Sequence, residues 1–309
     1  MAGMALTDAY AGELLALAET DGRIVVLDAD VAKRMGTLKG FGARFPQRWV
    51  NVGIAEQNML GIAAGLAAAG KIPFAGTFAV FLTGRAYDQI RQSIAYPRLS
   101  VKLIGAHGGL SVGEDGPSHQ SYEDLSLMRS LPNMTVLAPC DADETRQAVR
   151  LARDTDGPVY IRLFRPSAHP IVPPGYRMEI GKAHVLRSGK DLTFIACGLM
   201  VGLAMQASDA LASEGIKAGV VNMSSLKPLD RDAVLRAAHT TRAIVTAEDH
   251  SNIGGLGSAV AEILAEAGVG RLVRVGIPDR FAESGDHEAL FEKYGLSARH
   301  LADAGRKLL

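Results

Sequence analysis

The first half of the chain alternates short aliphatic and β-branched runs with longer segments in which apolar residues recur at helical spacing. Such alternation is typical of parallel strands joined by crossover helices. Asp141 is the expected N-cap of one helix, with Glu144 three residues on as in a capping box. The predicted strands are residues 24–27, 72–76, 101–105, 134–137 and 159–163, and the predicted helices are 55–69, 80–95, 122–130 and 142–154.

Four prolines then interrupt this pattern within residues 166–174. Proline fixes φ and removes a backbone donor, so this stretch is expected to be an extended linker. A second alternating pattern follows it. Its predicted strands are residues 192–196, 217–222, 243–246 and 272–276, and its predicted helices are 201–214, 230–238, 256–267 and 287–293.

These patterns predict an α/β protein with two doubly wound, mostly parallel-sheet domains joined by a Pro-rich linker. We expect a first domain at residues 1–166, the linker at 167–181 and a second domain at 182–309. The length of 309 residues suits two domains of about 150 residues each.

Charge and composition argue against several classes of protein. The chain has 33 basic and 33 acidic residues, so no charge excess indicates nucleic acid or a membrane surface. Its longest apolar stretch, residues 59–70, is too short to cross about 30 Å of hydrocarbon. Acidic residues precede the first basic residue, Arg23, unlike a signal peptide, and Cys140 and Cys197 are expected to be buried thiols. We therefore expect a cytoplasmic protein that binds neither nucleic acid nor membrane.

Residues 109–113 match the nucleophile elbow of α/β-hydrolases, with Ser111 as nucleophile and Asp115 and His119 following in hydrolase order. The elbow must run into a helix, whereas the glycines and the proline that follow break helices. Three triad side chains so close in sequence are also difficult to align on a rigid scaffold. A serine hydrolase is therefore a distant alternative.

Two segments combine polar and aromatic residues with a strand-to-helix transition. Residues 51–59 place Glu56 at the start of an apolar helix, where the helix dipole favours a carboxylate. Residues 76–81 place Phe78 and Phe81 on a turn between a strand and a helix. Each segment alone is also compatible with helix capping or core packing.

A third segment, residues 107–120, contains His107, His119, an acidic pair that includes Asp115, four glycines and a proline. Loops rich in both glycine and ionisable groups are often functional when a rigid scaffold holds them. Taken alone, this segment is also compatible with a solvated turn.

Together the three segments resemble the pyrimidine-binding domain of the transketolase family. The resemblance rests on Gly-Ile-Ala-Glu-Gln-Asn-Met at 53–59, Gly-Thr-Phe-Ala-Val-Phe at 76–81 and Gly-Glu-Asp-Gly-Pro-Ser-His-Gln at 113–120. It extends in order and spacing to Arg165 and, more weakly, across the second half. The length is similar to that of the C-terminal section of split transketolases.

The resemblance implies a thiamine-diphosphate-dependent transferase that moves a two-carbon ketol unit from a ketose phosphate to an aldose phosphate. Glu56 is then the catalytic carboxylate that contacts N1′ of the cofactor's aminopyrimidine, and Phe81, with Phe78 beside it, stacks on that ring. The cofactor supplies the carbanion chemistry, and the protein positions and stabilises the reacting groups.

The same resemblance assigns the substrate-binding residues. His107 and His119 are expected to act in catalysis by hydrogen-bonding the hydroxyl and carbonyl oxygens of the substrate. Asp115 is expected to contact the C2 hydroxyl of the acceptor. Arg165 is expected to bind the phosphate, because a guanidinium fork matches a phosphate dianion.

The chain departs from the family pattern at two places. Gly84 stands where many single-chain transketolases have an aromatic residue, so the cofactor pocket is expected to be less fully lined. The serine and arginine that hold the donor phosphate upstream of the glutamate have no match in residues 31–48, where Arg34 and Lys39 are candidate substitutes.

The family holds the cofactor's diphosphate through Mg²⁺ on a Gly-Asp-Gly motif, which suits the oxygen ligands of this ion. That motif is absent from the sequence, since its only Gly-Asp, at Gly285, is followed by His287. We therefore expect no metal ligands in this chain and Mg²⁺ ligands on a partner. The partner is an N-terminal-section transketolase subunit, without which the chain is inactive, in an assembly with two copies of each.

Other members of the wider family are alternatives. A subunit of an enzyme like 1-deoxyxylulose-5-phosphate synthase shares the glutamate and the Asp-Gly-x-Thr/Ser-His element. A β subunit of a 2-oxo-acid dehydrogenase fits less well, because Asp115 and Arg165 would have no sugar phosphate to bind. A non-enzymatic homologue that stabilises a partner is a further alternative, although the ionisable residues of the family are present.

Overall fold

The computed structural model describes residues 3–31 and 38–309, without the side chains of residues 38 and 39. Its strands are β1 (Ile24–Asp28), β2 (Trp49–Asn51), β3 (Ile72–Phe78), β4 (Lys102–Ala106), β5 (Thr135–Leu137), β6 (Val159–Leu163), β7 (His184–Arg187), β8 (Leu192–Ala196), β9 (Ala218–Asn222), β10 (Ser225–Lys227), β11 (Ala243–Ser251) and β12 (Leu272–Ile277). Within the described residues, they form a seven-stranded sheet in the order β10-β5-β6-β4-β3-β1-β2 and a five-stranded sheet in the order β12-β11-β8-β9-β7. All pairs are parallel except β10–β5 and β7–β9, which confirms the predicted α/β class.

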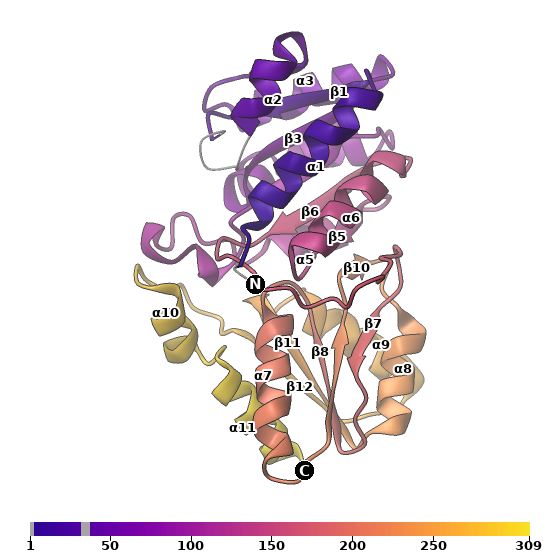
Figure 1. Cartoon of the computed structure of the whole chain (residues 1–309), viewed down its shortest axis with the longest axis vertical. Coiled ribbons are helices and arrows are strands. Elements are labelled where there is room, and N and C mark those ends of the chain that lie inside the picture. The colour runs from indigo at the N-terminus through magenta and orange to yellow at the C-terminus, as the bar shows by residue number, and fades with distance from the viewer. Residues whose placement is uncertain (1–2, 32–37) are drawn as a thin grey trace.

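The α-helices are α1 (Leu6–Thr20), α2 (Leu38–Arg44), α3 (Glu56–Ala68), α4 (Tyr87–Gln89), α5 (Asp124–Ser130), α6 (Ala142–Asp154), α7 (Met200–Ala212), α8 (Arg231–Thr240), α9 (Leu256–Ala267), α10 (His287–Tyr294) and α11 (Ala298–Leu308). Two 3-10 helices, η1 (Pro46–Arg48) and η4 (Leu110–Asp115), and two π-helices, η2 (Phe81–Arg85) and η3 (Ile90–Ala95), complete the described helices. The two sheets with their helices lie one above the other, and the segment that leads into α1 starts between them (Figure 1).

Every predicted strand is present, and β11 continues beyond its predicted end to Ser251. The predicted helix over residues 80–95 is divided into η2, α4 and η3. The sequence patterns missed α1, α2 and α11 among the α-helices and β2, β7 and β10 among the strands.

Helices cover both faces of the first sheet because successive strand residues point to opposite sides. Ile24 and Val26 of β1 share an apolar cluster with α1 and α6, whereas Val25 and Leu27 belong to a cluster with α3, η3 and α5. In the second sheet, α7 and α11 pack on one face and α8 and α9 on the other. Among the described helices, none is both long and apolar enough to cross a membrane.

The first sheet is completed by a strand from the second half of the chain. β10 pairs with β5, and the Nζ of Lys227 donates hydrogen bonds to the carbonyl oxygens of Arg129 (2.7 Å) and Leu131 (2.5 Å). The predicted ranges of the two domains remain a prediction, but the second half supplies an edge strand to the sheet of the first.

The proline-rich stretch is held against α6. The N-cap carboxylate of Asp141 accepts the N–H of Glu144 (2.9 Å), as predicted, and also accepts those of Ile171 (2.7 Å) and Val172 (2.9 Å). Glu144 reaches back to the N–H of Cys140 (2.8 Å). The only β-structure of the described chain between β6 and β7 is an isolated bridge between Ala168 and Met4. The role of this stretch as a linker remains a prediction.

A buried ion pair lies where the two domains meet. The Nε of Arg162, in β6, is 2.9 Å from the Oδ2 of Asp124, the first residue of α5, and the hydroxyl of Tyr160 donates to the same oxygen (2.7 Å). The Nη2 of Arg162 also donates to the backbone carbonyl of Asp249 in β11 (2.6 Å). One guanidinium therefore connects the two sheets.

His250, the next residue of β11, is fully buried at this junction. Burial lowers its pKa to about 4, so the imidazole is neutral near pH 7. The hydrogen bonds require the neutral form, because Nε2 accepts the N–H of Ser126 (3.3 Å) while Nδ1 donates to the carbonyl of Ser251 (2.8 Å). The folded state therefore resists protonation of this residue.

We expect acid to destabilise the fold through His250. A histidine whose folded pKa is depressed contributes stability above its unfolded pKa of 6.5, and this contribution is lost as pH falls toward about 4. His250→Gln lacks this loss, so from pH 7 to pH 5 its free energy of unfolding relative to wild type should increase by about 2 kcal/mol. Urea titrations at the two pH values measure this, with exposed His239→Gln as control. An unchanged difference between His250→Gln and wild type would contradict the prediction.

Candidate functional site

Four rings from separate segments meet where parallel strands of the first sheet end, the edge at which α/β proteins usually bind ligands. Phe78 ends β3, Phe81 begins η2, His107 follows β4, and His119 follows η4. The ring centroid of Phe78 lies 4.9 Å from that of His107 and 5.5 Å from that of His119, in edge-to-face geometry. Phe81 lies 5.1 Å from His119, whose Nδ1 is 3.0 Å from the hydroxyl of Ser118. The structure thus brings together four of the residues that the sequence selected.

Glu56 is joined to this group through Arg85. Glu56 begins α3 and is only 2% exposed. Its Oε2 is 2.7 Å from the Nη1 of Arg85, whose guanidinium carbon lies 4.6 Å from the ring centroid of Phe81. A flat cation therefore lies over an aromatic face and against a buried carboxylate.

Arg85 was missed at the sequence level, although one signal was available. It follows Phe81 by four residues, a spacing that places two side chains on the same face of a helix. The position that Arg85 takes suits any flat group with an N–H that can face Glu56 while its ring lies on Phe81. Gly84, the residue before Arg85, stands where many single-chain transketolases have an aromatic side chain. A Cβ added at Gly84 would meet no atom within 4 Å, so the space around this position is open.

The loop of residues 107–120 has an unusual backbone and an ion pair with the end of the first domain. His107 has a φ of +55°, in the left-handed region that non-glycine residues rarely adopt. The Oδ2 of Asp115 is 2.8 Å from the Nη1 of Arg165, which also donates to the carbonyl of Val112 (2.7 Å). Among the described residues, both hydrogen bonds of Arg165 use Nη1, so its Nε–Nη2 edge can still face an anion.

The contacts of Ser111 do not form a hydrolase triad. Ser111 is 2% exposed, and its hydroxyl donates to the carbonyl of Gly108 (3.2 Å). Asp115 is paired with Arg165, and His119 contacts the Phe78 and Phe81 rings. A nucleophile needs an adjacent base, and the contacts of Asp115 and His119 lie elsewhere.

A small cavity of about 290 Å³ lies between the 107–120 loop and the second domain. Arg165 and residues 111–114 line one side, and residues 285–287, including His287 at the start of α10, line the other. Of the residues predicted to bind cofactor or sugar phosphate, Arg165 is the one that lines this cavity.

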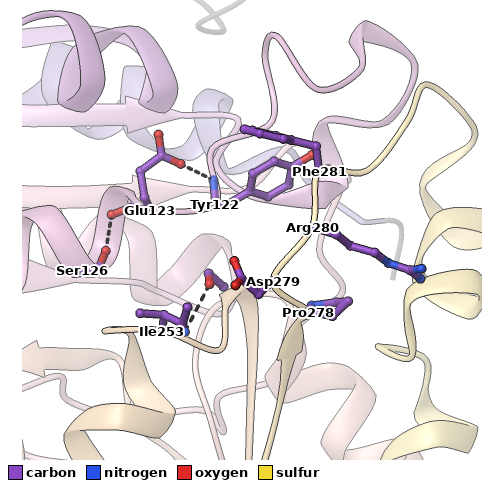
Figure 2. Close-up of a pocket in the computed structure, with 9 residues that line it drawn as sticks. Tyr122, Glu123, Ser126, Ile253, Pro278, Asp279, Arg280 and Phe281 are labelled. Carbon is purple, nitrogen blue, oxygen red and sulfur yellow. Dashed lines mark hydrogen bonds between the residues drawn. The ribbon is translucent and has the colours of Figure 1, made fainter.

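A second cavity, of about 480 Å³, opens at the junction of the domains (Figure 2). Tyr122, Glu123 and Ser126 come from the first domain, and Ile253 and residues 278–281 come from the second. None of the predicted site residues lines it.

Two expectations concern residues outside these clusters. Arg34 lies outside the described residues, as does the side chain of Lys39, so the structure does not place them. Within residues 3–31 and 38–309, no group of three or more His, Cys, Asp or Glu side chains could hold a metal ion.

Residues 2–170 match the family model of the transketolase pyrimidine-binding domain, and residues 181–301 match that of the transketolase C-terminal domain. The chain is 46% identical over 303 residues to a 6-deoxy-6-sulfo-D-fructose transketolase subunit from Clostridium sp. (strain MSTE9), covering 98% of this chain and 94% of the relative. It is 40% identical to 1-deoxy-D-xylulose-5-phosphate synthase from Syntrophotalea carbinolica, covering 98% of this chain but 48% of that enzyme.

A solved structure described as a split-gene transketolase, inactive β4 tetramer, is 50% identical and superposes with a TM-score of 0.92, with 99% of each chain covered. The sequence match and the fold therefore agree over both domains. The chain belongs to the transketolase family, in which it corresponds to the C-terminal section of a split transketolase.

Proposed function

We propose that this chain is the pyrimidine-binding subunit of a thiamine-diphosphate-dependent transketolase that transfers a two-carbon ketol unit from a ketose phosphate to an aldose phosphate. The observation that carries the proposal is the placement of Glu56, Phe78, Phe81, His107 and His119 around one position at the edge of the first sheet.

The residues fit the pyrimidine end of the cofactor. When bound, thiamine diphosphate supplies a nucleophilic carbon for breaking and forming the carbon–carbon bond. Glu56 would hold N1′ of the ring through a shared proton, and Phe81 would stack on the ring and exclude water. Because the guanidinium of Arg85 already lies on Phe81 and against Glu56, it must move aside for the ring.

His107 and His119 lie edge-to-face against Phe78, and in the proposal they bind the polar oxygens of a sugar. Asp115 contacts an acceptor hydroxyl in the proposal, and Arg165 offers its second edge to the terminal anion. The Clostridium relative is named for a sugar whose terminal group is a sulfonate. We therefore include phosphorylated and sulfonated sugars among the substrates to be tested.

A partner chain completes the site in this proposal. Mg²⁺ and the diphosphate need oxygen ligands of the kind carried by a Gly-Asp-Gly motif, which the sequence lacks. The split-gene relative described as an inactive β4 tetramer supports the same dependence on a second subunit. The second subunit is an N-terminal section, in an assembly with two copies of each chain.

The alternative is a synthase that makes 1-deoxyxylulose 5-phosphate, and the match to such an enzyme motivates it. A 1-deoxy product lacks the hydroxyl that a ketol unit carries, so its donor must be a 2-oxo acid such as pyruvate. Turnover of pyruvate with an aldose phosphate, but not of ketose phosphates, would favour this alternative over ketol transfer.

The first prediction of the proposed function concerns assembly. The isolated chain should bind thiamine diphosphate weakly and lack activity, and both should appear when an N-terminal-section subunit is added, because the diphosphate ligands lie on that subunit. Calorimetric titration of the cofactor and sedimentation of the mixture measure binding and stoichiometry. Normal turnover of xylulose 5-phosphate by the purified chain alone would refute the partner requirement.

The second prediction concerns Glu56. Glu56→Gln keeps the shape of the side chain but cannot share a proton with N1′ of the ring, so C2 deprotonation of the bound cofactor should slow by about 10² to 10⁴. Hydrogen–deuterium exchange at C2 in the assembled complex measures this rate directly.

Glu13→Gln provides a matched control for Glu56→Gln. It alters another pair of a buried glutamate with a half-exposed arginine, between Glu13 and Arg150 (2.6 Å), which joins α1 to α6. In this variant, hydrogen–deuterium exchange at C2 of the bound cofactor should remain at the wild-type rate. Wild-type exchange in Glu56→Gln as well would show that Glu56 only begins the helix.

The third prediction concerns the terminal anion of the substrate. Arg165→Ala should raise KM for sugar phosphates about ten- to hundredfold, the usual value of a charge-assisted hydrogen bond, with a smaller effect on hydroxypyruvate. Arg165→Lys should give an intermediate KM because it keeps the charge without the fork. Steady-state kinetics with both donors distinguish the outcomes, and an equal loss for both would rule out an anion-binding role.

A further inference from the structure

The 107–120 loop, which carries the proposed substrate-binding residues of the first domain, is held by a carboxylate of the second. Asp249 lies near the end of β11 and is buried. Its Oδ1 accepts the N–H of Leu110 (2.7 Å), and its Oδ2 accepts the N–H of Ser111 (3.2 Å). These are the first two N–H groups of η4, which has no side-chain cap from the residue that precedes it. Asp249 therefore caps the short helix of the loop from the other domain.

The loop backbone is adapted to this carboxylate. Gly109 has a φ of +87°, and a Cβ added there would lie 2.3 Å from the Oδ2 of Asp249. Only glycine allows both this conformation and this approach. Two residues earlier, His107 has its left-handed backbone conformation, which persists only where neighbouring contacts enforce it. The contacts with Asp249, at Leu110 and Ser111, begin three residues after His107 in the same loop.

The far end of the loop meets the second domain as well. The Nε2 of Gln120 donates to the carbonyl of Glu283 (3.1 Å), and the hydroxyl of Tyr122 accepts the N–H of Ala282 (3.0 Å). A Cβ at Gly116 would lie 2.3 Å from the hydroxyl of Ser284. Figure 2 shows Tyr122 beside the segment that leads into these residues. The loop is thus fixed at both ends by the second domain, and Asp249 provides the charged contact.

We propose that Asp249 is a positioning residue for ketol transfer. By binding the N–H groups of Leu110 and Ser111, it fixes the loop conformation that presents His107, Asp115 and His119 to the sugar. The second domain then takes part in substrate recognition without touching the substrate. The kinetic part of this proposal rests on the proposed function, whereas the structural part does not.

Asp249→Asn in the assembled enzyme tests the proposal. The side-chain amide keeps the shape but presents an NH₂ group to one of the two N–H donors, so one hydrogen bond is lost. Amide exchange of residues 109–113, followed by mass spectrometry, should accelerate about ten- to hundredfold, the usual effect of losing a charge-assisted hydrogen bond. KM for ketose phosphates should rise within the same range, while the Kd for thiamine diphosphate stays within about twofold of wild type, below the effect of a single lost hydrogen bond.

Glu248→Gln is the matched control. Glu248 is the preceding residue of β11, is equally buried, and also accepts two N–H groups, from Leu256 (2.6 Å) and Gly257 (2.7 Å). Both donors belong to α9 of its own domain. Burial raises the pKa of Glu248 to about 7, so glutamine resembles the protonated form. The only expected effect of this variant is a lower melting temperature. Amide exchange of residues 109–113 and KM for ketose phosphates should stay at wild-type values.

The outcomes separate positioning from general stabilisation. If Asp249→Asn lowers the melting temperature while loop exchange and KM stay at wild-type values, Asp249 is only structural and the proposal is wrong. Equal acceleration of loop exchange in Glu248→Gln would also overturn it. If Asp249→Asn does not assemble, Gly109→Ala perturbs the same contact from the loop side and should raise loop exchange and KM, and unchanged values would refute the proposal. A wild-type enzyme inactive on all ketose phosphates would instead refute the proposed function, and the exchange measurements would still decide the role of Asp249.

Discussion

Arg162 and Asp124 form an ion pair almost completely shielded from solvent between the two sheets, with side-chain exposures of 4% and 0%. Neither charge is tolerable there alone, and removing one partner of such a pair usually costs about 3–5 kcal/mol. Further contacts support the pair, since Tyr160 donates to the Oδ2 of the carboxylate and the guanidinium donates to the backbone of β11. These directional bonds fix the end of β11 against the first sheet. The positions of Asp249 and His250, and through them the 107–120 loop, follow from that attachment.

The sequence pattern predicted the central strands and most flanking helices, because their apolar runs are bounded by clear turn residues. Elements at the periphery were harder to predict for local reasons. α1 carries apolar or small residues around much of its circumference, and it is buried on more than one side, which weakens the helical contrast on which prediction depends. β10 has three residues, and its pairing with β5 depends on tertiary contacts that no local pattern encodes.

The candidate site shows a similar division. Its residue types were recognisable from short motifs, and the structure brings the rings of Phe78, Phe81, His107 and His119 together. Contacts between distant segments were not predictable in this way. Arg85 meets Glu56 across 29 positions, and Asp249 reaches Leu110 across 139, so neither pairing has a signature within one segment. Motifs thus selected residues that the structure brings together, while the packing of the domains determined which groups hold them in place.

The pairing of β10, from the second half of the chain, with β5 of the first sheet limits where a gene of this family can be divided. A fragment that ended with the proline-rich stretch would leave β5 as a bare edge, with unpaired N–H and C=O groups able to recruit another chain. The second domain therefore protects its neighbour from aggregation in addition to packing against it. Placing the two domains on separate chains would expose that edge until the second chain bound. We therefore expect the two domains to stay together on one chain when genes of this family are split or fused.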